Sequence, residues 1–457
     1  MDHRRDERNA RIYSSKAARI KFVVFALIPV FIISCLSIPY ARASAGSQAL
    51  STEDNEYFKN LAGDTYNCID FYVDPKTGLP ADNTKRSGES YTSVTNIGLY
   101  MAVLAGACEL GLEDKGDASK KIKKIMRTMD QAKTWSNFPY NWINIRTLQV
   151  REEFVSSVDL GNYFAGIIVA RQYFPELRKD ADRLLADLDF NLLYDKQKKF
   201  LYHGYNTKSH VYTQWHYDLL GSESRLAYLV GIAVGGLPPQ SWNLQVKNLE
   251  YRYGIEYLKP GWQGGGMFLG FMAGLFINEQ GTLPGLSAGN LAKAQMIHMK
   301  NINSGVWGWS ASNSPLYGYL GFENIRDDVV APYASVLAVS LFPGEVIANL
   351  RKLEELGVRP RQLEDGIYHN FGFRDAYDIK TSMVTDNYLM LDQSMLFLSL
   401  TNFLTDGFVN GLFESYPPVK NALSEINKYS DLSSGKTVFP VNLSKKYGLS
   451  ASRYEEK

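Results

Sequence analysis

Apolar residues recur at helical spacing from about residue 53 to residue 413, and this periodicity constrains the fold more than any other feature. Runs with the strict alternation of half-buried strands are few. The periodic segments fall mostly into pairs, so they predict an all-α protein whose helical hairpins close into an α/α barrel of two concentric rings. The expected helices cover residues 53–72, 94–112, 116–134, 158–173, 177–187, 221–236, 264–277, 288–299, 329–342, 344–356, 383–404 and 408–413.

The domain organisation follows from composition along the chain. No composition break or low-complexity linker interrupts residues 50–425, and the separators between the expected helices are short and rich in Gly, Pro and Asn. We therefore expect residues 50–425 to form a single domain, which is large but within the reach of a helical toroid. Residues 426–457 are rich in Ser, Lys and Gly, and we expect them to form a polar C-terminal tail.

The first 43 residues have the order of a secretory signal peptide. A basic region within the first 21 residues precedes an apolar run over residues 22–38, and Ala41-Arg42-Ala43 offers a small-x-small cleavage site. Two alternatives remain open: Ile32-Ile33-Ser34-Cys35 resembles a bacterial lipobox with Cys35 as the lipidated residue, and an uncleaved apolar run would act as a single anchor helix. We expect export to the periplasm or cell surface, with membrane contact only through this segment.

Charge and ligand-type residues exclude several classes of function. The net charge is +1, and residues 1–43 hold eight basic and three acidic side chains, so the remainder carries about −4. A mildly acidic chain has no electrostatic footprint for nucleic acid, and we expect no nucleic-acid partner. No Cys/His cluster has metal-ligand spacing, so we expect no metal and no other cofactor. Many Tyr and Trp residues adjoin Gly, Asn and Ser, which suits sugar faces as well as a large core.

Glu223 is the first candidate for chemistry. It follows the aromatic segment Trp215–Tyr217 and stands at the mouth of the apolar segment Ala227–Val234. A carboxyl beside a low-dielectric helix holds its proton more tightly than in water, and a general acid requires this near neutral pH. In the alternative interpretation, Glu223 pairs with Arg225 or the helix is capped through Ser222, because structural ion pairs also perturb carboxylates.

Three other carboxylates have comparable ambiguity. Asp159 begins an expected helix, where an ordinary N-cap explains it equally well. Asp375 lies between aromatic residues but adjoins Arg374, so its role could be limited to a structural salt bridge with that residue. Asp392 lies within the last long expected helix. Residue type and spacing alone leave these alternatives open.

Ten ordered segments resemble the bacterial glucoamylase-like family, which includes endo-β-1,2-glucanases and part of the cyclic β-1,2-glucan synthases. The segments are Thr95–Tyr100, Tyr140–Trp142, Ser156–Asn162, Tyr217–Leu226, Pro238–Trp242, Gly265–Phe268, Trp307–Ser310, Ala331–Ala334, Gly372–Ala376 and Asp392–Met395. Each is weak by itself, but the ordered set spans most of residues 65–405. The resemblance implies an (α/α)6 barrel that acts on β-glucan.

Two departures from the family pattern bear on the reaction. Synthase-type members carry a Glu at the position of Ala311 and another at the position of Asp375. The shorter Asp375 leaves more room for a water molecule. Inverting glycosidases hold their carboxyl groups ~6.5–9.5 Å apart for this purpose, against ~5–5.5 Å in retaining enzymes. Both departures favour hydrolysis over glycosyl transfer.

The resemblance and the local chemistry together predict an exported, monomeric, inverting glycoside hydrolase that cleaves β-1,2-glucan within the chain. Glu223 is the expected general acid and Asp375 the expected general base acting through water, with Asp378 or Asp392 as substitutes for the base. The expected substrate-binding residues are Asp159, Asp218, Asp378, Tyr140, Trp142, Trp215, Trp262, Trp307, Trp309 and Arg374.

Other functions stay open at this point. The first is a non-catalytic glycan-binding or assembly protein that keeps the aromatic residues without needing the carboxylates. The second is a polysaccharide lyase, since α/α toroids also host lyases, with a base such as His216 or His369 beside a Tyr. A transglycosylase is the third.

Overall fold

The computed structural model describes residues 50–85, 90–426 and 437–449. The predicted signal peptide over residues 1–43, with Cys35, lies outside the described residues. Within the described ranges, no helix combines the length and the apolar character that crossing a membrane requires.

Helices dominate the structure. In chain order they are α1 (Thr52–Phe71), α2 (Val94–Glu109), α3 (Lys115–Met129), α4 (Ser157–Tyr173), α5 (Arg178–Leu184), α6 (Arg225–Val234), α7 (Gln240–Asn243), α8 (Met267–Phe271), α9 (Leu283–Asn301), α10 (Pro332–Val336), α11 (Pro343–Glu355), α12 (Met390–Leu404), α13 (Phe408–Ser415), α14 (Pro417–Glu425) and α15 (Leu443–Tyr447). Short 3₁₀ turns occur at Pro175–Leu177, Phe190–Leu193 and Ala273–Leu275.

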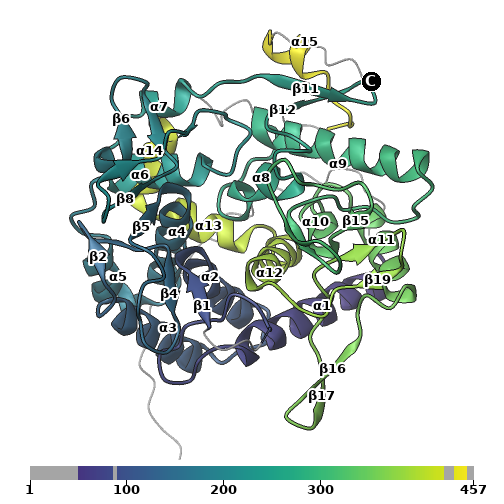
Figure 1. Ribbon diagram of the computed structural model, residues 1–457, viewed down its shortest axis with the longest axis horizontal. Helices are drawn as coiled ribbons and strands as arrows, with labels where there is room; N and C mark the ends of the chain where they lie inside the picture. Colours follow the sequence, from purple (N-terminus) through teal and green to yellow (C-terminus); the bar gives the residue numbers. More distant parts are fainter. Residues whose placement is uncertain (1–49, 86–89, 427–436, 450–457) are drawn as a thin grey trace, which may run out of the picture. The chain divides into compact units, whose positions relative to one another are not determined.

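The helices are arranged in an inner and an outer set (Figure 1). In the inner set α2 packs against α4 and α12, α4 against α6, and α10 against α8 and α12. Arg225 at the start of α6 reaches the α8 region, where it donates to the Gly270 carbonyl (2.8 Å) and pairs with Glu279 (2.7 Å). Outside this set, α1 covers α12, α3 covers α2, α5 covers α4, α9 covers α8 and α11 covers α10.

Glycine allows the closest contacts between inner helices. A Cβ atom at Gly98 in α2 would lie 2.5 Å from the Tyr163 Cα in α4, and one at Gly166 would lie 1.9 Å from the Gly98 carbonyl oxygen. A Cβ atom at Gly161 would lie 2.5 Å from the Ala227 Cα in α6. Any larger residue would push these helices apart, so the glycines fix the spacing from α2 to α6.

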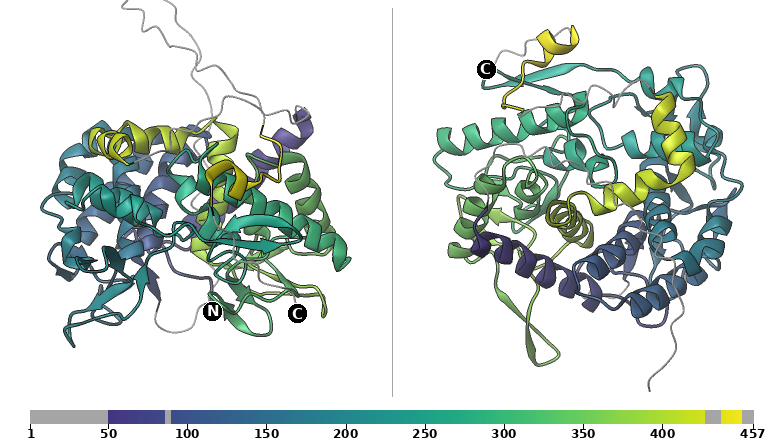
Figure 2. Two further views of the ribbon diagram at one scale, coloured as in Figure 1. Left: turned by 90° about the horizontal axis from the view of Figure 1, so that it is seen from above. Right: turned by 180° about the vertical axis from the view of Figure 1, so that it is seen from behind.

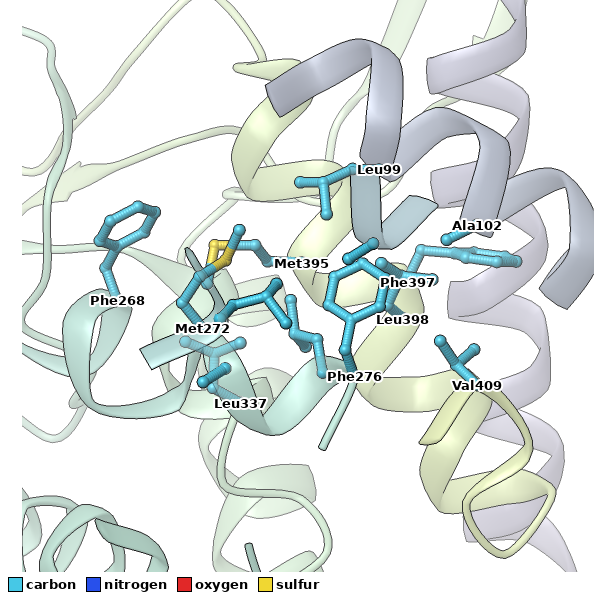
Figure 3. Packing of buried hydrophobic residues seen from close by; sticks show 14 of the residues in the cluster. Leu99, Ala102, Phe268, Met272, Phe276, Leu337, Met395, Phe397, Leu398 and Val409 are labelled. Atoms are coloured by element: carbon cyan, nitrogen blue, oxygen red, sulfur yellow. The ribbon is translucent and has the colours of Figure 1, made fainter. Parts of the chain in front are cut away.

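The inner helices enclose the hydrophobic core. Figure 3 shows the side chains of Leu99 on α2, Leu337 after α10 and Met395 on α12 directed toward a common apolar region, together with Phe268 on α8 and Val409 on α13. These side chains are buried and belong to one continuous cluster. Helices that are apolar nearly all round, as α2 and α12 are, occupy the interior of a large protein.

Short antiparallel strands connect the helices. They are β1 (Tyr91–Ser93), β2 (Thr134–Trp135), β3 (Phe138–Pro139), β4 (Trp142–Asn144), β5 (Phe154–Ser156), β6 (Tyr194–Asp195), β7 (Phe200–Tyr202), β8 (Gly204–Asn206), β9 (Val211–Tyr212), β10 (His216–Tyr217), β11 (Leu249–Arg252), β12 (Ile255–Leu258), β13 (Ser312–Ser314), β14 (Gly318–Leu320), β15 (Val329–Val330), β16 (Arg361–Glu364), β17 (Ile367–Asn370), β18 (Tyr377–Asp378) and β19 (Met383–Val384). Their sheets are β1–β4, β2–β3, β5–β8–β9, β6–β7–β10, β11–β12, β13–β14, β15–β18–β19 and β16–β17.

The strands position the beginnings of the inner helices. β1 runs directly into α2 and is held by β4 in the register Ser93 to Trp142, and β5 runs directly into α4. In the left view of Figure 2, most strands lie toward the bottom, whereas α13 and α14 lie at the top. The two ends of the helical assembly therefore differ, and the strands mark the end where α2 and α4 begin.

Each expected helix has a counterpart in the structure, but several boundaries differ. The expected helix 264–277 is divided into α8 and the 3₁₀ turn Ala273–Leu275, the expected helix 288–299 lies within the longer α9, and α7, α14 and α15 are additional to the expected helices. The expected helix 383–404 begins only at Met390, because residues 383–384 pair with β18 as β19. The expected helix 329–342 begins only at Pro332, because residues 329–330 form β15, and it ends at Val336, where turns follow. These losses reflect tertiary context that overrides local propensity.

Part of the C-terminal region packs onto the body. The side-chain amide of Asn290 in α9 donates to the Val441 carbonyl and accepts from the Val441 N–H, both at 2.7 Å. Leu443 is buried, and Ser444 donates to Glu256 in β12 through its backbone N–H (2.7 Å). Residues 437–449 thus lie on α9 and β12.

Candidate active site

Acidic side chains gather where inner helices begin. Asp159 lies in the first turn of α4, Asp392 lies in the first turn of α12, and Glu223 stands two residues before α6. The unpaired N–H groups of a helix N-terminus carry a partial positive charge and stabilise nearby anions. The fold thus brings carboxyl groups from distant parts of the sequence together and offsets part of their mutual repulsion.

Glu223 lies in the turn that leads into α6, and Arg225 holds this turn from the protein interior. The Arg225 guanidinium donates to the Ser222 carbonyl (2.7 Å) and pairs with Glu279 (2.7 Å). Ser224 is the N-cap residue of α6 but makes no side-chain capping bond, and its hydroxyl bonds to the Ser222 hydroxyl (2.7 Å). Arg225, two positions after Glu223 in the sequence, therefore forms its ion pair with Glu279.

The environment of Glu223 favours its protonated form. Burial, and secondarily the charge of Asp159, raise the pKa of Glu223 to about 8. Burial and the charges of these two carboxylates also raise the pKa of the Tyr217 phenol, so all three groups lie close together. Asp159 accepts a hydrogen bond from the Thr95 hydroxyl (2.6 Å). At neutral pH Glu223 keeps its proton, which is the state that a general acid requires.

Asp375 and Asp392 form a buried carboxyl pair. Asp375 is 1% exposed, and its Oδ2 accepts a hydrogen bond from the N–H of Asn313 in β13 (2.5 Å). The Asp375 carboxylate also accepts a hydrogen bond from the N–H of Leu389. A hydrogen bond joins the two carboxyls, and burial together with the charge of Asp375 raises the pKa of Asp392 well above its usual range. Burial also raises the pKa of Asp375, but the hydrogen bonds from Asp392, Asn313 and Leu389 partly offset this increase. The pair therefore shares one proton, with Asp392 protonated and Asp375 ionised.

Asp82 belongs to the same group, although sequence reasoning missed it. The Asp82 carbonyl accepts the N–H of Met390 at the start of α12 (2.8 Å), and its carboxylate accepts the Asn96 amide in α2 (3.0 Å). Its charge acts on both Asp375 and Asp392. Asp82 is half-buried, and burial raises its pKa. The only sequence signal is its place in a Gly/Pro-rich separator between expected helices.

Tyr319 is influenced both by Glu223 and by the Asp375–Asp392 pair. Burial of its hydroxyl end raises the pKa of the phenol, and the charges of Asp392, Glu223, Asp375 and Asp82 raise it further. One phenol therefore lies within electrostatic reach of the candidate acid and of the candidate base. Glu223 and Asp375, separated by 152 positions in the sequence, face the same region.

Asp378 and Arg374, both predicted to bind substrate, contact other groups of the protein. Asp378 is buried, and its Oδ1 accepts the N–H (2.9 Å) and the hydroxyl (3.0 Å) of Thr381, which closes the turn between β18 and β19. The Arg374 guanidinium donates to Gln362 and lies 4.8 Å from the ring centroid of Tyr388. Asp378 thus closes this turn, and its predicted contact with substrate and its predicted role as a substitute for Asp375 stay predictions.

Three of the five predicted stacking tryptophans are buried, which corrects their predicted role. Trp262, Trp307 and Trp309 are at most 1% exposed. The Gln295 amide donates to the Trp309 carbonyl (2.6 Å) and accepts its N–H (2.8 Å). Asn349 binds the backbone of Trp307 in the same way, at 2.8 and 2.9 Å. Helices α9 and α11 thereby lock the Trp-Gly-Trp segment into the core, where no sugar ring can stack on it.

The other predicted contact residues differ in accessibility. Tyr140 is 3% exposed and its hydroxyl bonds to Thr207 (2.7 Å), so its ring also belongs to the core. Trp142 and Asp218 are half-buried. Trp215, directly before β10, is 64% exposed. Of this group, Trp142, Trp215 and Asp218 retain surface that a ligand could contact.

The two histidines considered for a lyase have partners of their own. His216 Nε2 lies 2.9 Å from Asp195 Oδ2. The His369 ring stacks on Phe371 with 5.1 Å between centroids. In the described part of the chain, no group of three or more His, Cys, Asp or Glu side chains is suited to hold a metal ion.

A protonated Glu and an ionised Asp, facing one region from different elements, can donate and accept a proton in the same reaction. Comparison with known proteins bears on what that reaction is. Residues 287–417 match the family Glycoamylase, described as putative glucoamylase. This chain is similar to glucoamylase-like proteins. Residues 64–252 match a second family, DUF3131, which is described only as a protein of unknown function.

A curated relative supports the same resemblance. The cyclic β-(1,2)-glucan synthase NdvB of Rhizobium meliloti (strain 1021) is 27% identical over 293 residues, which make up 57% of this chain and 10% of the synthase. The chain therefore spans about a tenth of the length of that protein. The resemblance predicted from the ordered segments is confirmed.

Solved structures share the fold. A putative glucoamylase from Bacteroides uniformis superposes with a TM-score of 0.72 at 19% identity, over 83% of this chain and 98% of that one. An endo-β-1,2-glucanase from Chitinophaga pinensis, solved with sophorotriose and glucose, gives 0.70 at 18% identity over 83% and 98%. One from Talaromyces funiculosus, solved with sophorose, gives 0.61 at 12% identity over 80% and 87%. The described helices thus form a glucoamylase-like fold.

Proposed function

We propose that this protein is an exported, inverting glycoside hydrolase that cleaves β-1,2-glucan within the chain, on a helical assembly that is an (α/α)6 barrel. The observation that carries the proposal is the pair of unlike carboxyl groups: Glu223 holds its proton near neutral pH, and Asp375 is ionised beside the protonated Asp392. Environments that push two carboxyl pKa values apart define an acid and a base.

In the proposed reaction, Glu223 transfers its proton to the glycosidic oxygen as the bond from that oxygen to the anomeric carbon breaks. Asp375 accepts a proton from a water molecule whose oxygen attacks the anomeric carbon from the opposite face. One bond forms and one breaks, and the configuration at the anomeric carbon inverts. Glu223 ends ionised and Asp375 ends protonated, so proton exchange with solvent restores the starting state.

The role of base is assigned by elimination among four carboxylates. Asp392 holds the proton of its pair and cannot accept another, and Asp378 is committed to Thr381. Asp375 is ionised but 1% exposed, so its water molecule must be enclosed between substrate and protein. Asp82 is half-buried and better exposed, which makes it the alternative base.

The substrate class rests on the relatives. The neighbouring structures include endo-β-1,2-glucanases solved with sophorotriose or sophorose, and the curated relative is a cyclic β-(1,2)-glucan synthase. Ala311 stands where synthase-type relatives carry Glu, which favours hydrolysis. The proposal of export rests on the order of basic, apolar and small residues over residues 1–43. Mass spectrometry of the N-terminus of the protein from its native host tests it, and an intact Met1 on a protein found in the cytosol would contradict it.

The direct test is incubation of the purified protein with a panel of linear β-glucans. We expect short oligosaccharides from β-1,2-glucan, and proton NMR early in the reaction should show the inverted anomer. An unsaturated sugar end would instead identify a lyase, and longer chains with retained configuration would identify a transglycosylase. Binding of glucan without release of any oligosaccharide would identify a non-catalytic binding protein.

A further inference from the structure

The β13–β14 hairpin and the residues that follow it carry a set of exposed apolar side chains beside the carboxyl groups. Leu316, Tyr317, Tyr319 and Phe322 are all exposed, and Tyr319 has the largest exposed fraction, 62%. Exposing apolar side chains of this kind to water is unfavourable in free energy. Their concentration at one hairpin next to a candidate active site indicates a surface that a ligand covers.

Tyr319 has two different ends. Its hydroxyl lies within electrostatic reach of Asp392, Glu223, Asp375 and Asp82, and burial together with their charges raises its pKa, so the phenol keeps its proton. Most of the Tyr319 side chain, including its ring, is open to solvent. One edge of the ring lies near Gly321, where an added Cβ atom would be 3.0 Å from the ring. The residue thus offers a proton donor inside the site and an aromatic surface at its mouth.

The hairpin is fixed to the site. The Asn313 N–H donates to Asp375 Oδ2 (2.5 Å), and Ser312 pairs with Leu320 across the hairpin. The Ser314 hydroxyl accepts the N–H groups of Leu316 (3.2 Å) and Tyr317 (3.3 Å), which shapes the turn. Tyr319 is therefore held in place relative to Asp375 by main-chain hydrogen bonds.

The two tyrosines of the hairpin differ in what covers them. The Arg326 guanidinium lies 4.0 Å from the ring centroid of Tyr317, so a protein cation already occupies one face of that ring. Tyr319 is the more exposed ring, and its hydroxyl faces the carboxyls. The two side chains thus lend themselves to different roles.

We propose that Tyr319 forms a sugar-binding subsite at the point of cleavage, with a glucose ring stacked on its aromatic face and a sugar hydroxyl accepting its phenol proton. This proposal rests on the proposed function. The equatorial hydroxyl groups of β-glucose leave apolar C–H faces, which match the exposed ring. The phenol between Glu223 and Asp375 would orient the bound sugar relative to both groups.

Binding measurements can separate this subsite from the catalytic carboxyls. In a Glu223→Gln background, which prevents turnover, titration calorimetry with a linear β-1,2-linked glucohexaose gives the reference Kd. Tyr319→Ala removes both ring and hydroxyl and should weaken binding about tenfold or more. Tyr319→Phe keeps the ring, and the loss of one hydrogen bond should weaken binding by about 2- to 10-fold.

Tyr368→Ala is the matched control. Tyr368 is an equally exposed tyrosine on a hairpin, 59%, with an Arg361 guanidinium near its ring, but its hairpin β16–β17 projects away from the inner helices (Figure 1). We expect this variant to bind like the reference. Because Tyr319 is mostly exposed, its variants should unfold at the reference temperature.

The outcomes distinguish the two proposals. Unchanged binding in both Tyr319 variants, with a reference protein that binds, would overturn the subsite and leave the proposed function intact. A reference protein that binds no β-1,2-linked oligosaccharide would overturn both. In the otherwise wild-type enzyme, Tyr319→Phe should lower kcat more than it raises KM, because its hydroxyl lies beside the reacting groups. An effect on KM alone would reduce the role to stacking and overturn the assigned hydrogen bond.

Discussion

The two sides of the site keep a carboxyl group in opposite states by different means. Glu223 has Asp159 as its charged neighbour, and burial holds its proton. Asp375 is more deeply buried, yet it is ionised because Asn313 and Leu389 donate to it and Asp392 takes the proton of the pair. Burial alone therefore does not determine the charge of a carboxyl. Hydrogen-bond donors and neighbouring carboxyl groups, together with burial, determine whether it acts as an acid or a base.

Removing the acid should produce the largest effect. Glu223→Gln keeps the shape of the side chain and removes its transferable proton, so turnover of β-1,2-glucan should fall by ~10²–10⁴-fold. Glucan binding should persist. Glu250→Gln is a matched control, because burial also raises the pKa of Glu250 but this residue lies on β11. Near-normal hydrolysis by Glu223→Gln would reduce Glu223 to a structural residue.

Removing the base should have an effect of similar size. The same experiment shows whether Asp375 or Asp82 acts as the base. Asp375→Asn should lower turnover by ~10²–10⁴-fold. Asp82→Asn should lower it less, because Asp82 contributes charge near the pair rather than accepting the proton. The comparison needs only initial rates at saturating glucan. If the order of the two losses is reversed, Asp82 is the base and Asp375 supports it.

Changes at Asp392 test the shared proton with a smaller expected effect. Asp392→Asn imitates the protonated carboxyl, so activity should fall by no more than about tenfold and the acid limb of the pH profile should stay in place. Asp392→Ala removes a donor that lowers the pKa of Asp375, and the acid limb should move to higher pH. Loss of activity in Asp392→Asn as severe as that in Asp375→Asn would instead identify Asp392 as the base.

The smallest expected effect is on stability. The folded-state pKa of Glu223 is raised to about 8, so its contribution to stability is present below the ordinary Glu range and is lost as the pH rises through about 8. Glu223→Gln has no such proton to lose. Its thermal midpoint relative to wild type should therefore increase between about pH 4 and pH 8. A constant difference over this range would show that Glu223 titrates normally. In the wild type, the alkaline limb of activity should also fall near pH 8.

What could be predicted from the sequence depended on how local its cause was. The long helices follow from apolar spacing within each segment, and Glu223 was identifiable because the buried helix that raises its pKa directly follows it. Asp82 was missed because the carboxyls that define its role, Asp375 and Asp392, lie about 300 positions away. Strands of two to four residues carry too few side chains to show a period.

The aromatic residues give the same lesson from the opposite direction. Trp307 and Trp309 beside glycines resemble a ligand platform in the sequence, but the Asn349 and Gln295 amides hold their backbone in the core. Tyr319, ten positions further on, lies at the surface. The sequence alone does not distinguish the two segments, because the amides that fix the first come from α9 and α11.

The anchoring of the β13–β14 hairpin has a consequence for how this molecule can change its preference for substrates. Main-chain hydrogen bonds to Asp375 and across the hairpin hold its base, and the exposed side chains contribute little to the core. Gly318 has a φ of 73°, which favours glycine, but the identities of residues 316, 317 and 319 are nearly independent of folding. A library that varies these positions while keeping Asn313 and Ser314 should yield mostly folded proteins, and selection for other glucan linkages can begin from this hairpin without rebuilding the carboxyl groups beneath it.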